Sequence, residues 1–536
     1  MKKFAKAVTA FLLGALLPYL NAQVTLEHTY TGKLMQRVQL ENSGEKYYVL
    51  DTLAPELHFY HANHTPWKTV SLPLNPGFVV DDIVHVSETV IDPDNNLEIV
   101  YKTRTPFGGG VYEEEWRVAS EDGQLLLNES NAEKLYIQEN ENMSPKLIVV
   151  HRVSNVNRSW KIYGLPGLQA EHVYTGAGFA RVGLENSGEK YYLLNQADAY
   201  IQLYNADHNL WKQIDLPLVP GESIIRIEHL SETKFNQDAL LEIGYHCQGP
   251  GFRNRIANEN GHLLLDTACC MGQRLSLIDG LPARLILLPD GFGSTTQYHV
   301  YSIPGLTREY TYSSFAFQFD RIRLEGSGEK YVLKNYFSSD LSLYNPDHSL
   351  WKTMMFDASP GLGSAGFSHL SETRIDPDNM LEACYIAYNT PLQQSEGWVR
   401  KEDGHVFLYL PRATDFRLSE LPGLPNKLLA TVDTATDNLH VYGLPSSTYV
   451  GLEPETLPAD GISLYPNPAS GSFTLESADK LPENVYLSSL NGAVLKQINV
   501  YTNKMIIDVS GLRPGLYLVH GTLQSGRIFH KKVVIR

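Results

Sequence analysis

The octapeptide ENSGEKYY stands at residues 41–48 and again at 185–192, and EGSGEKY stands at 325–331. Four further motifs recur with the same spacing of roughly 140 residues and in the same order after each of these stretches. They are Trp-Lys (67, 211, 351), His-x-Ser-Glu-Thr (85, 229, 369), EDG or ENG (121, 259, 402) and YGLPG, YSIPG or YGLPS (163, 301, 442). Residues 26–446 are therefore a threefold tandem repeat, with copies at about 26–167, 168–305 and 306–446.

Within each repeat, short segments rich in aromatic and β-branched residues alternate with frequent turns, which predicts strands and almost no helix. We read twelve strands per repeat in three groups of four, with KYYLLN (190–195) opening the first group and SIIRIEHLSE (223–232) closing it. Four-stranded sheets of about 45 residues are typical of propeller blades. The sequence thus predicts an all-β chain with a β-propeller of nine blades.

The ends of the repeat region fit a closed ring. Residues 24–31 and 36–43 would supply the last two strands of one blade, and residues 427–433 and 439–445 its first two. Nine blades exceed the usual four to eight. A row of separate all-β domains and a ring with fewer blades therefore remain alternatives.

The N-terminus has the layout of a signal peptide. Lys2, Lys3 and Lys6 precede the apolar stretch 7–20, which is shorter than the ~20 residues of a membrane-spanning helix. We predict cleavage after residue 22.

The net charge of −16 repels nucleic acid. An exported chain meets oxidising conditions, so a disulfide from Cys247 to Cys269 or Cys270 is a further hypothesis, with Cys384 left over.

A Pro- and Gly-containing linker at 447–460 precedes a C-terminal unit at 461–536, whose roughly seven short apolar segments predict an immunoglobulin-like β-sandwich. YPNPASGSFTL (465–475), DVSGLRPGLYLV (508–519) and the basic final segment KKVVIR (531–536) follow one another to the C-terminus. In this order they resemble the type A C-terminal sorting domains of the type IX secretion system of Bacteroidetes.

The resemblance implies export across the outer membrane to the cell surface or the medium, with the secretion machinery as a partner. It also implies attachment of the remainder to surface lipopolysaccharide, or its release. By the same resemblance, recognition and folding are the roles expected of five residues, namely Pro466, Asn467, Pro468, Gly515 and Tyr517.

Three recurring glutamates, Glu98, Glu242 and Glu382, fall on segments that we assign as innermost strands, so they are candidate ligand contacts in a central channel. His85, His229 and His369 fall on predicted outer strands, too far apart to share a metal. Trp67 and its two equivalents are assigned to packing between blades. The DPDN segments at 92–95 and 376–379 are interpreted as side-chain-stabilised turns, since the twelve-residue calcium pattern is missing.

No catalytic, cofactor-binding or metal-binding residues are predicted. We favour a non-enzymatic binding or scaffold module with a carbohydrate or protein ligand. The alternatives are a secreted hydrolase acting on polysaccharide, which would need two carboxylates ~5–10 Å apart in a cleft, and a structural or adhesion element.

Overall fold

The computed structural model describes residues 24–536 with several gaps. The gaps comprise residues 33, 52–53, 107–112, 141–142, 290–295, 315, 336–339, 356–365, 434–437, 445–461, 478–483, 490–493, 500–501, 514 and 523–527. The predicted signal peptide (1–22) and linker (447–460) lie outside the described residues. Within the described part of the chain, no helix is long and apolar enough to cross a membrane.

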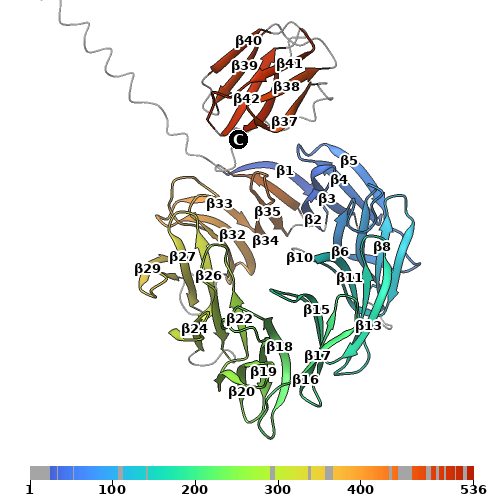
Figure 1. The fold of residues 1–536 in the computed structure, drawn as a ribbon, viewed down its shortest axis with the longest axis vertical. Coiled ribbons are helices and arrows are strands. Elements are labelled where there is room, and N and C mark those ends of the chain that lie inside the picture. Colours follow the sequence, from blue (N-terminus) through green and yellow to red (C-terminus); the bar gives the residue numbers. More distant parts are fainter. Residues whose placement is uncertain are drawn as a thin grey trace, which may run out of the picture. The chain divides into compact units, whose positions relative to one another are not determined.

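The chain folds as two compact units, Met1–Thr448 and Tyr449–Arg536. The described part of the first unit consists of nine four-stranded antiparallel sheets, which follow one another around a central axis (Figure 1). We number the sheets 1 to 9 in chain order of their first strand. This arrangement is a β-propeller-like, all-β fold.

The strands of the first repeat form sheets 1 to 3. Sheet 1 contains β2 (Met35–Leu40), β3 (Gly44–Asp51), β4 (Glu56–His61) and β5 (Pro66–Ser71). Sheet 2 contains β6 (Val79–Ser87), β7 (Glu98–Arg104), β8 (Glu114–Ser120) and β9 (Leu125–Ser130). Sheet 3 contains β10 (Ala132–Asn140), β11 (Met143–Arg152), β12 (Arg158–Gly164) and β13 (Gln169–Gly176).

The second repeat has the same order in sheets 4 to 6. Sheet 4 contains β14 (Gly178–Leu184), β15 (Gly188–Asn195), β16 (Tyr200–Asn205) and β17 (Leu210–Asp215). Sheet 5 contains β18 (Ser223–Ser231), β19 (Glu242–Gln248), β20 (Phe252–Asn258) and β21 (Leu263–Thr267). Sheet 6 contains β22 (Gly272–Ser276), β23 (Arg284–Leu288), β24 (Thr296–Ser302) and β25 (Arg308–Ser314).

The third repeat forms sheets 7 to 9. Sheet 7 contains β26 (Ala316–Leu324), β27 (Gly328–Asn335), β28 (Asp340–Tyr344) and β29 (Leu350–Met355). Sheet 8 contains β30 (Gly366–Ser371), β31 (Glu382–Asn389), β32 (Gln394–Lys401) and β33 (Val406–Pro411). Sheet 9 contains β34 (Ala413–Ser419), β35 (Lys427–Val432), β36 (Asn438–Gly443) and β1 (Thr25–Thr31).

Sheet 9 combines the two ends of the repeat region. Residues 25–31 of β1 pair antiparallel with residues 438–443 of β36. The N-terminal end thus supplies one strand and the C-terminal end three, so the prediction of two strands from each end is wrong. Across the boundary between sheets 9 and 1, Nη1 of Arg37 donates to the carbonyl of Ser419 at 3.1 Å. In the opposite direction, Nη2 of Arg417 donates to the carbonyl of Met35 at 2.9 Å.

The difference comes from the ENSG motif, which the predicted strand grouping puts between two sheets. In the structure it is the turn that joins the first two strands of one sheet, because Leu40 pairs with Gly44. Gly44 has φ of +74°, a conformation that glycine adopts without strain and that closes a short hairpin. Each predicted group of four strands therefore started one strand too late. Its last strand, such as β18, begins the next sheet instead.

A reciprocal contact between glutamates and backbone joins sheet 1 to sheet 2. The carboxylate of Glu88, just after β6, accepts hydrogen bonds from the backbone N–H groups of Asn42 and Ser43 at 2.7 and 2.9 Å and from the Ser43 hydroxyl. Oε2 of Glu41 in turn accepts the backbone N–H of Glu88 at 2.8 Å. We call this arrangement the glutamate clasp. It recurs in Glu185, Asn186 and Ser187 with Glu232, and in Glu325, Gly326 and Ser327 with Glu372.

Other repeated motifs also connect neighbouring sheets. Lys68 on β5 forms an ion pair with Glu121, which follows β8 of the next sheet. The ammonium groups of Lys46 and Lys68 lie 4.7 and 4.9 Å from the centre of the Trp67 ring, and Trp67 packs against the apolar core shared by sheets 1 and 2, as predicted. The hydroxyl of Tyr30 on β1 hydrogen-bonds Nδ1 of His64 at 2.7 Å, linking sheet 9 to sheet 1. The equivalent pairs are Lys212 and Glu259, Lys352 and Glu402, Tyr174 and His208, and Tyr312 and His348.

The described part of the second unit contains strands and no helix. It contains β37 (Ile462–Ser470), β38 (Ser472–Ser477), β39 (Asn484–Ser489), β40 (Val494–Asn499), β41 (Lys504–Asp508), β42 (Gly515–Thr522) and β43 (Ile528–Ile535). β37 pairs with β38 along its first half and with β43 at Ala469, so it belongs to two strand ladders. Its core includes Phe473, Leu487 and Val519.

We expect removal of a clasp carboxylate to destabilise the first unit. In Glu232→Ala, the N–H groups of Asn186 and Ser187 lose their acceptor, which should cost about 1–3 kcal/mol. Urea unfolding of the exported chain followed by circular dichroism measures this loss. Glu113→Ala, at an exposed glutamate, is the control and should change stability by less than about 0.5 kcal/mol. Equal unfolding midpoints for the two variants would refute the structural role of the clasp.

Candidate functional site

The three sequence motifs of the C-terminal unit meet at one place. Residues 466–468 lie in β37, and the next residue, Ala469, pairs in parallel with Ile535 of β43. The backbone N–H of Arg536 donates to the carbonyl of Ala469 at 3.0 Å. On the other side of β43, Gly515 of β42 pairs with the same Ile535. The structure therefore brings the three motifs together around Ile535 and Arg536, a contact that no local sequence pattern predicts.

Tyr517 stabilises the neighbouring turn. Its ring is partly buried against the core of the unit, and its hydroxyl donates to the carbonyl of Arg513 at 2.7 Å. A tyrosine that closes back onto its own turn restricts the segment before β42. The recognition role of the five motif residues stays a prediction.

The repeated glutamates do not line a channel. The first strands of successive sheets contact one another, as β6 does with β2 and β10, so the first strand is the innermost one. Glu98, Glu242 and Glu382 begin the second strand, and their side chains are at most 1% exposed. The prediction that they contact a ligand in the channel is therefore wrong about their position. It fails because the sheet boundaries were shifted by one strand.

Burial and neighbouring carboxylates favour the neutral form of these glutamates. Burial, with Asp94 and Asp92 nearby, raises the pKa of Glu98 to about 8. Burial next to Asp238 raises the pKa of Glu242 to about 8 as well. The pKa of Glu382 rises to about 9 for the same reasons. The raised pKa values favour the protonated, uncharged form of these three side chains at neutral pH.

In the third copy, a lysine side chain forms ion pairs with the acidic group. The carboxylates of Asp376, Asp378 and Glu382 lie within 4.8 Å of one another. Nζ of Lys401 lies 2.8 Å from Asp376 and also contacts Asp378. Lys401 pairs across β31 and β32 with Glu382, where the first and second copies have Ser120 and Asn258.

The loops before these glutamates are side-chain-stabilised turns, as predicted. Oδ1 of Asp94 accepts the backbone N–H of Asn96 at 2.9 Å, and Oδ1 of Asp378 accepts that of Met380 at 3.0 Å. Asn95 and Asn379 both have positive φ, which asparagine tolerates in turns.

The repeated histidines lie on the innermost strands rather than on outer ones. His85, His229 and His369 are residues of β6, β18 and β30. Burial lowers their pKa values, to about 4 for His229. They belong to neither of the two groups of adjacent potential metal ligands found in the described part of the chain.

The second of those groups consists of Cys269, Cys270 and His299. Cys247 forms no disulfide, so the hypothesis of a bridge from Cys247 to Cys269 or Cys270 is wrong. Cys247 is buried, and burial raises the pKa of its thiol to about 11. His299 was missed because it is 29 positions after Cys270 with no local motif. The signal available in the sequence was that the vicinal cysteines occur in one repeat copy alone.

Comparison with known proteins bears on the C-terminal unit. Residues 463–536 match the family model of the secretion system C-terminal sorting domain. The C-terminal region is also 32% identical over 83 residues to beta-agarase D from Zobellia galactanivorans. That alignment covers 16% of this chain and only 17% of the agarase. The chain therefore carries a type IX sorting domain, which implies a secreted or cell-surface protein.

Solved structures resemble the chain as a whole only remotely. PorZ, a surface component of the type IX secretion system of Porphyromonas gingivalis, is 10% identical with a TM-score of 0.19, covering 95% of this chain and 100% of PorZ. The Dos1 propeller is 9% identical with a TM-score of 0.37, covering 78% of this chain and 95% of that one. Similarity at this level carries no information about activity.

The raised pKa of the buried Glu242 predicts that the stability of the first unit depends on pH. Because the native pKa of Glu242 is about 8 and its ordinary value is 4.5, the folded state holds a proton that the unfolded state releases between these pH values. The stability from this group is present below pH 4.5 and is lost as the pH rises to about 8. Glu242→Gln should remove this loss and exceed the wild type at pH 9 by at least about 1 kcal/mol.

Urea unfolding at pH 5, 7 and 9 checks this expectation, with Glu113→Gln as the exposed control. A wild type and Glu242→Gln variant that respond identically to pH would show that Glu242 is ionised in the folded protein.

Proposed function

We propose that this protein is exported by the type IX secretion system and acts outside the cell as a non-enzymatic binding or scaffold module. In this proposal, residues 1–22 are removed, residues 23–446 form a closed nine-bladed propeller, and residues 461–536 form an immunoglobulin-like sorting domain. The match of residues 463–536 to the sorting-domain family is the observation that carries the export step.

The closed propeller is supported by the four-stranded sheets and by the pairing of β1 with β36. A propeller whose first and last strands share a sheet cannot open without breaking that sheet. The two ladders that share β37 support the sandwich.

The scaffold role is supported by the contacts that the repeated polar residues make between sheets. Glu88 and Glu41 hold turns, Lys68 and Glu121 pair across sheets, and Tyr30 bonds His64. Each of these contacts joins neighbouring sheets. Catalysis of glycoside hydrolysis needs two carboxylates with separated proton affinities facing a substrate. The repeated carboxylates of Glu41, Glu88 and Glu121 instead bond neighbouring sheets.

A hollow of about 660 Å³ near the innermost strands of sheets 6 and 7 is the candidate place for a ligand. Leu277, Ile278 and Asp279 line one side, and residues 321–325 with Arg374 line the rest. The exposed Arg323 donates to the carbonyl of Asp279 at 2.8 Å and leaves further N–H groups at the surface. Such a polar hollow suits hydroxyl or carboxylate groups of a carbohydrate.

Export is tested in a bacterium with a functional type IX system. The full chain should reach the surface or the medium, and a chain that ends before residue 461 should stay in the periplasm. Immunoblots of periplasmic, surface and medium fractions measure this. A variant with Ile506→Ser, at an exposed side chain of the same unit, is the control and should be exported. Export of the truncated chain would contradict the proposal.

Binding without catalysis is tested with the purified exported chain and a panel of soluble polysaccharides. Affinity electrophoresis should show retardation by at least one polysaccharide, weakened about tenfold in Arg323→Ala, since one charged hydrogen bond at a partly wet site is worth about 1.5 kcal/mol. A reducing-end assay on the same mixtures should stay at background. Release of new reducing ends by the purified chain would support the hydrolase alternative instead.

A further inference from the structure

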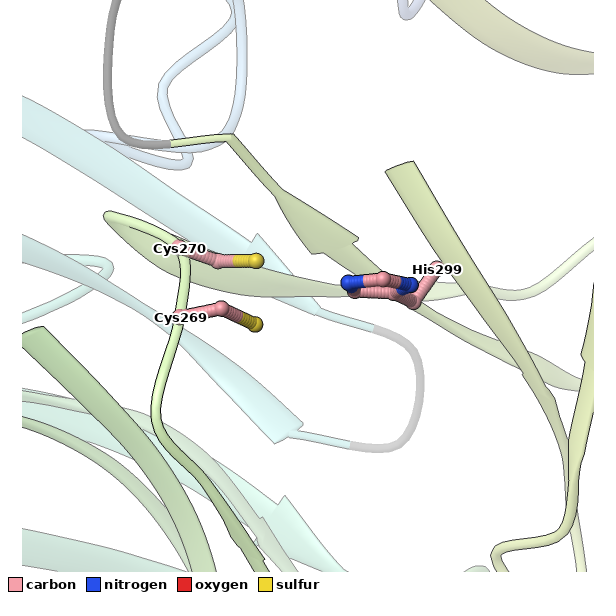
Figure 2. Close-up of side chains that lie close together, drawn as sticks. All are labelled: Cys269, Cys270 and His299. Carbon is pink, nitrogen blue, oxygen red and sulfur yellow. The ribbon is translucent and has the colours of Figure 1, made fainter. Parts of the chain in front are cut away.

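The sixth sheet contains a group of soft metal ligands. Cys269 and Cys270 lie in the segment between β21 and β22, and His299 lies on β24. One ligand atom from each residue lies within 4.8 Å of the other two. Figure 2 shows both thiol groups pointing from the same side toward the edge of the imidazole ring. Cys270 and His299 are buried, with 3% and 7% exposure, and Cys269 is partly exposed.

The backbone is arranged to present both thiols. Side chains of consecutive residues in an extended segment point to opposite faces. Cys270 has φ of +73°, which is unusual for a residue other than glycine and lets the two sulfur atoms face the same side. The buried amide of Asn254 holds this conformation, because Nδ2 donates to the carbonyl of Cys269 at 2.8 Å and to that of Cys270 at 2.9 Å.

The imidazole is oriented as a metal ligand would be. Nδ1 of His299 hydrogen-bonds Oγ1 of Thr311 on β25 at 2.9 Å. This bond leaves Nε2 as the nitrogen available for coordination. Histidine ligands of metals usually have their second nitrogen fixed in this way by an outer partner.

The other two repeats provide a built-in comparison. By strand register, the positions of Cys269 and Cys270 correspond to Asn131 and Ala132 in sheet 3 and to Arg412 and Ala413 in sheet 9. The position of His299 corresponds to Lys161 and His440.

His440 shows what a histidine does here without the thiols. Its Nδ1 lies 3.2 Å from Oγ1 of Thr29, the strand partner equivalent to Thr311. The positions equivalent to Cys269 and Cys270 are occupied by Arg412 and Ala413, which have no thiol. Of the three equivalent sheets, only sheet 6 has the complete ligand set. The common architecture of the repeat therefore does not require these cysteines.

We propose that Cys269, Cys270 and His299 bind one thiophilic metal ion of the Zn²⁺ class, a site beyond the proposed function of the module. Two thiolates and one imidazole form the ligand set of Cys₂His zinc sites that keep a fourth position open. Thiolate ligands select such ions over Ca²⁺ and Mg²⁺, which take oxygen ligands. Two thiolates also neutralise the charge of a divalent ion, and the partial exposure of Cys269 leaves room for water at the fourth position.

The test uses the full exported chain, reduced and desalted without oxygen and then titrated with Co²⁺. We expect a thiolate-to-cobalt charge-transfer band in the near ultraviolet that saturates at one equivalent and disappears when Zn²⁺ is added. His299→Ala and Cys270→Ser should lose the band. Thr311→Val should keep it but weaken metal affinity 10- to 100-fold, since an outer hydrogen bond to the ligand is lost.

Matched controls separate the site from other thiols and histidines. Cys247→Ser, Cys384→Ser and His440→Ala should all retain the band at one equivalent. Far-ultraviolet circular dichroism checks folding, and His299→Gln replaces any variant that fails to fold. The proposal is overturned if the wild type shows no saturable band, or if His299→Gln binds as the wild type does. It is equally overturned if mass spectrometry of the exported chain finds Cys269 and Cys270 joined in a disulfide.

Discussion

The glutamate clasp is the interaction on which the first unit depends. A turn such as Asn42-Ser43 has backbone N–H groups with no strand partner, and a hydrogen bond from such a group to a charged acceptor adds stability. Glu88 of the next sheet supplies that acceptor, and Glu41 supplies one in return. Each of the three clasps takes one half from each of two sheets, namely 1 and 2, 4 and 5, and 7 and 8, so neither sheet of such a pair satisfies these turn N–H groups alone. This mutual dependence favours a continuous series of sheets over a row of separate domains.

A series of mutually dependent sheets leaves a problem at its two ends, where the last sheet would lack a neighbour. Here a strand from the N-terminal end of the repeat region pairs with a strand from its C-terminal end. β1 completes sheet 9, Tyr30 on β1 reaches His64 in sheet 1, and Arg37 and Arg417 cross the same boundary in opposite directions. The contacts at this boundary are the same type as those inside the series, since the Tyr–His pair recurs as Tyr174 with His208.

Residues present in all three copies hold the sheets together, whereas the candidate metal ligands are present in one copy only. Polar residues found in all three copies, such as Glu88, Lys68 and His64, bond neighbouring sheets. Cys269, Cys270 and His299 are found together in one copy alone. Symmetric positions are constrained by packing three times over, so a chemical function is free to arise where one copy departs from the others. The C-terminal unit is different, since its motifs converge on the chain end, where Ala469 and Gly515 flank Ile535.

The sequence alone determined the threefold repeat, the strand character of the chain and the sorting motifs, because periodic anchors and turn residues are local signals. It also identified the packing role of Trp67 and the turn role of Asp94. Only the tertiary structure decided which strands share a sheet, since ENSG is a turn signal equally compatible with a hairpin and with a link between sheets. That one-strand difference moved Glu98, Glu242 and Glu382 from a channel into the interior and His85 onto an innermost strand. The convergence of Cys269 and Cys270 on His299 likewise depends on the pairing of β22, β23 and β24, because contacts between residues distant in sequence are set by strand register rather than by any local pattern.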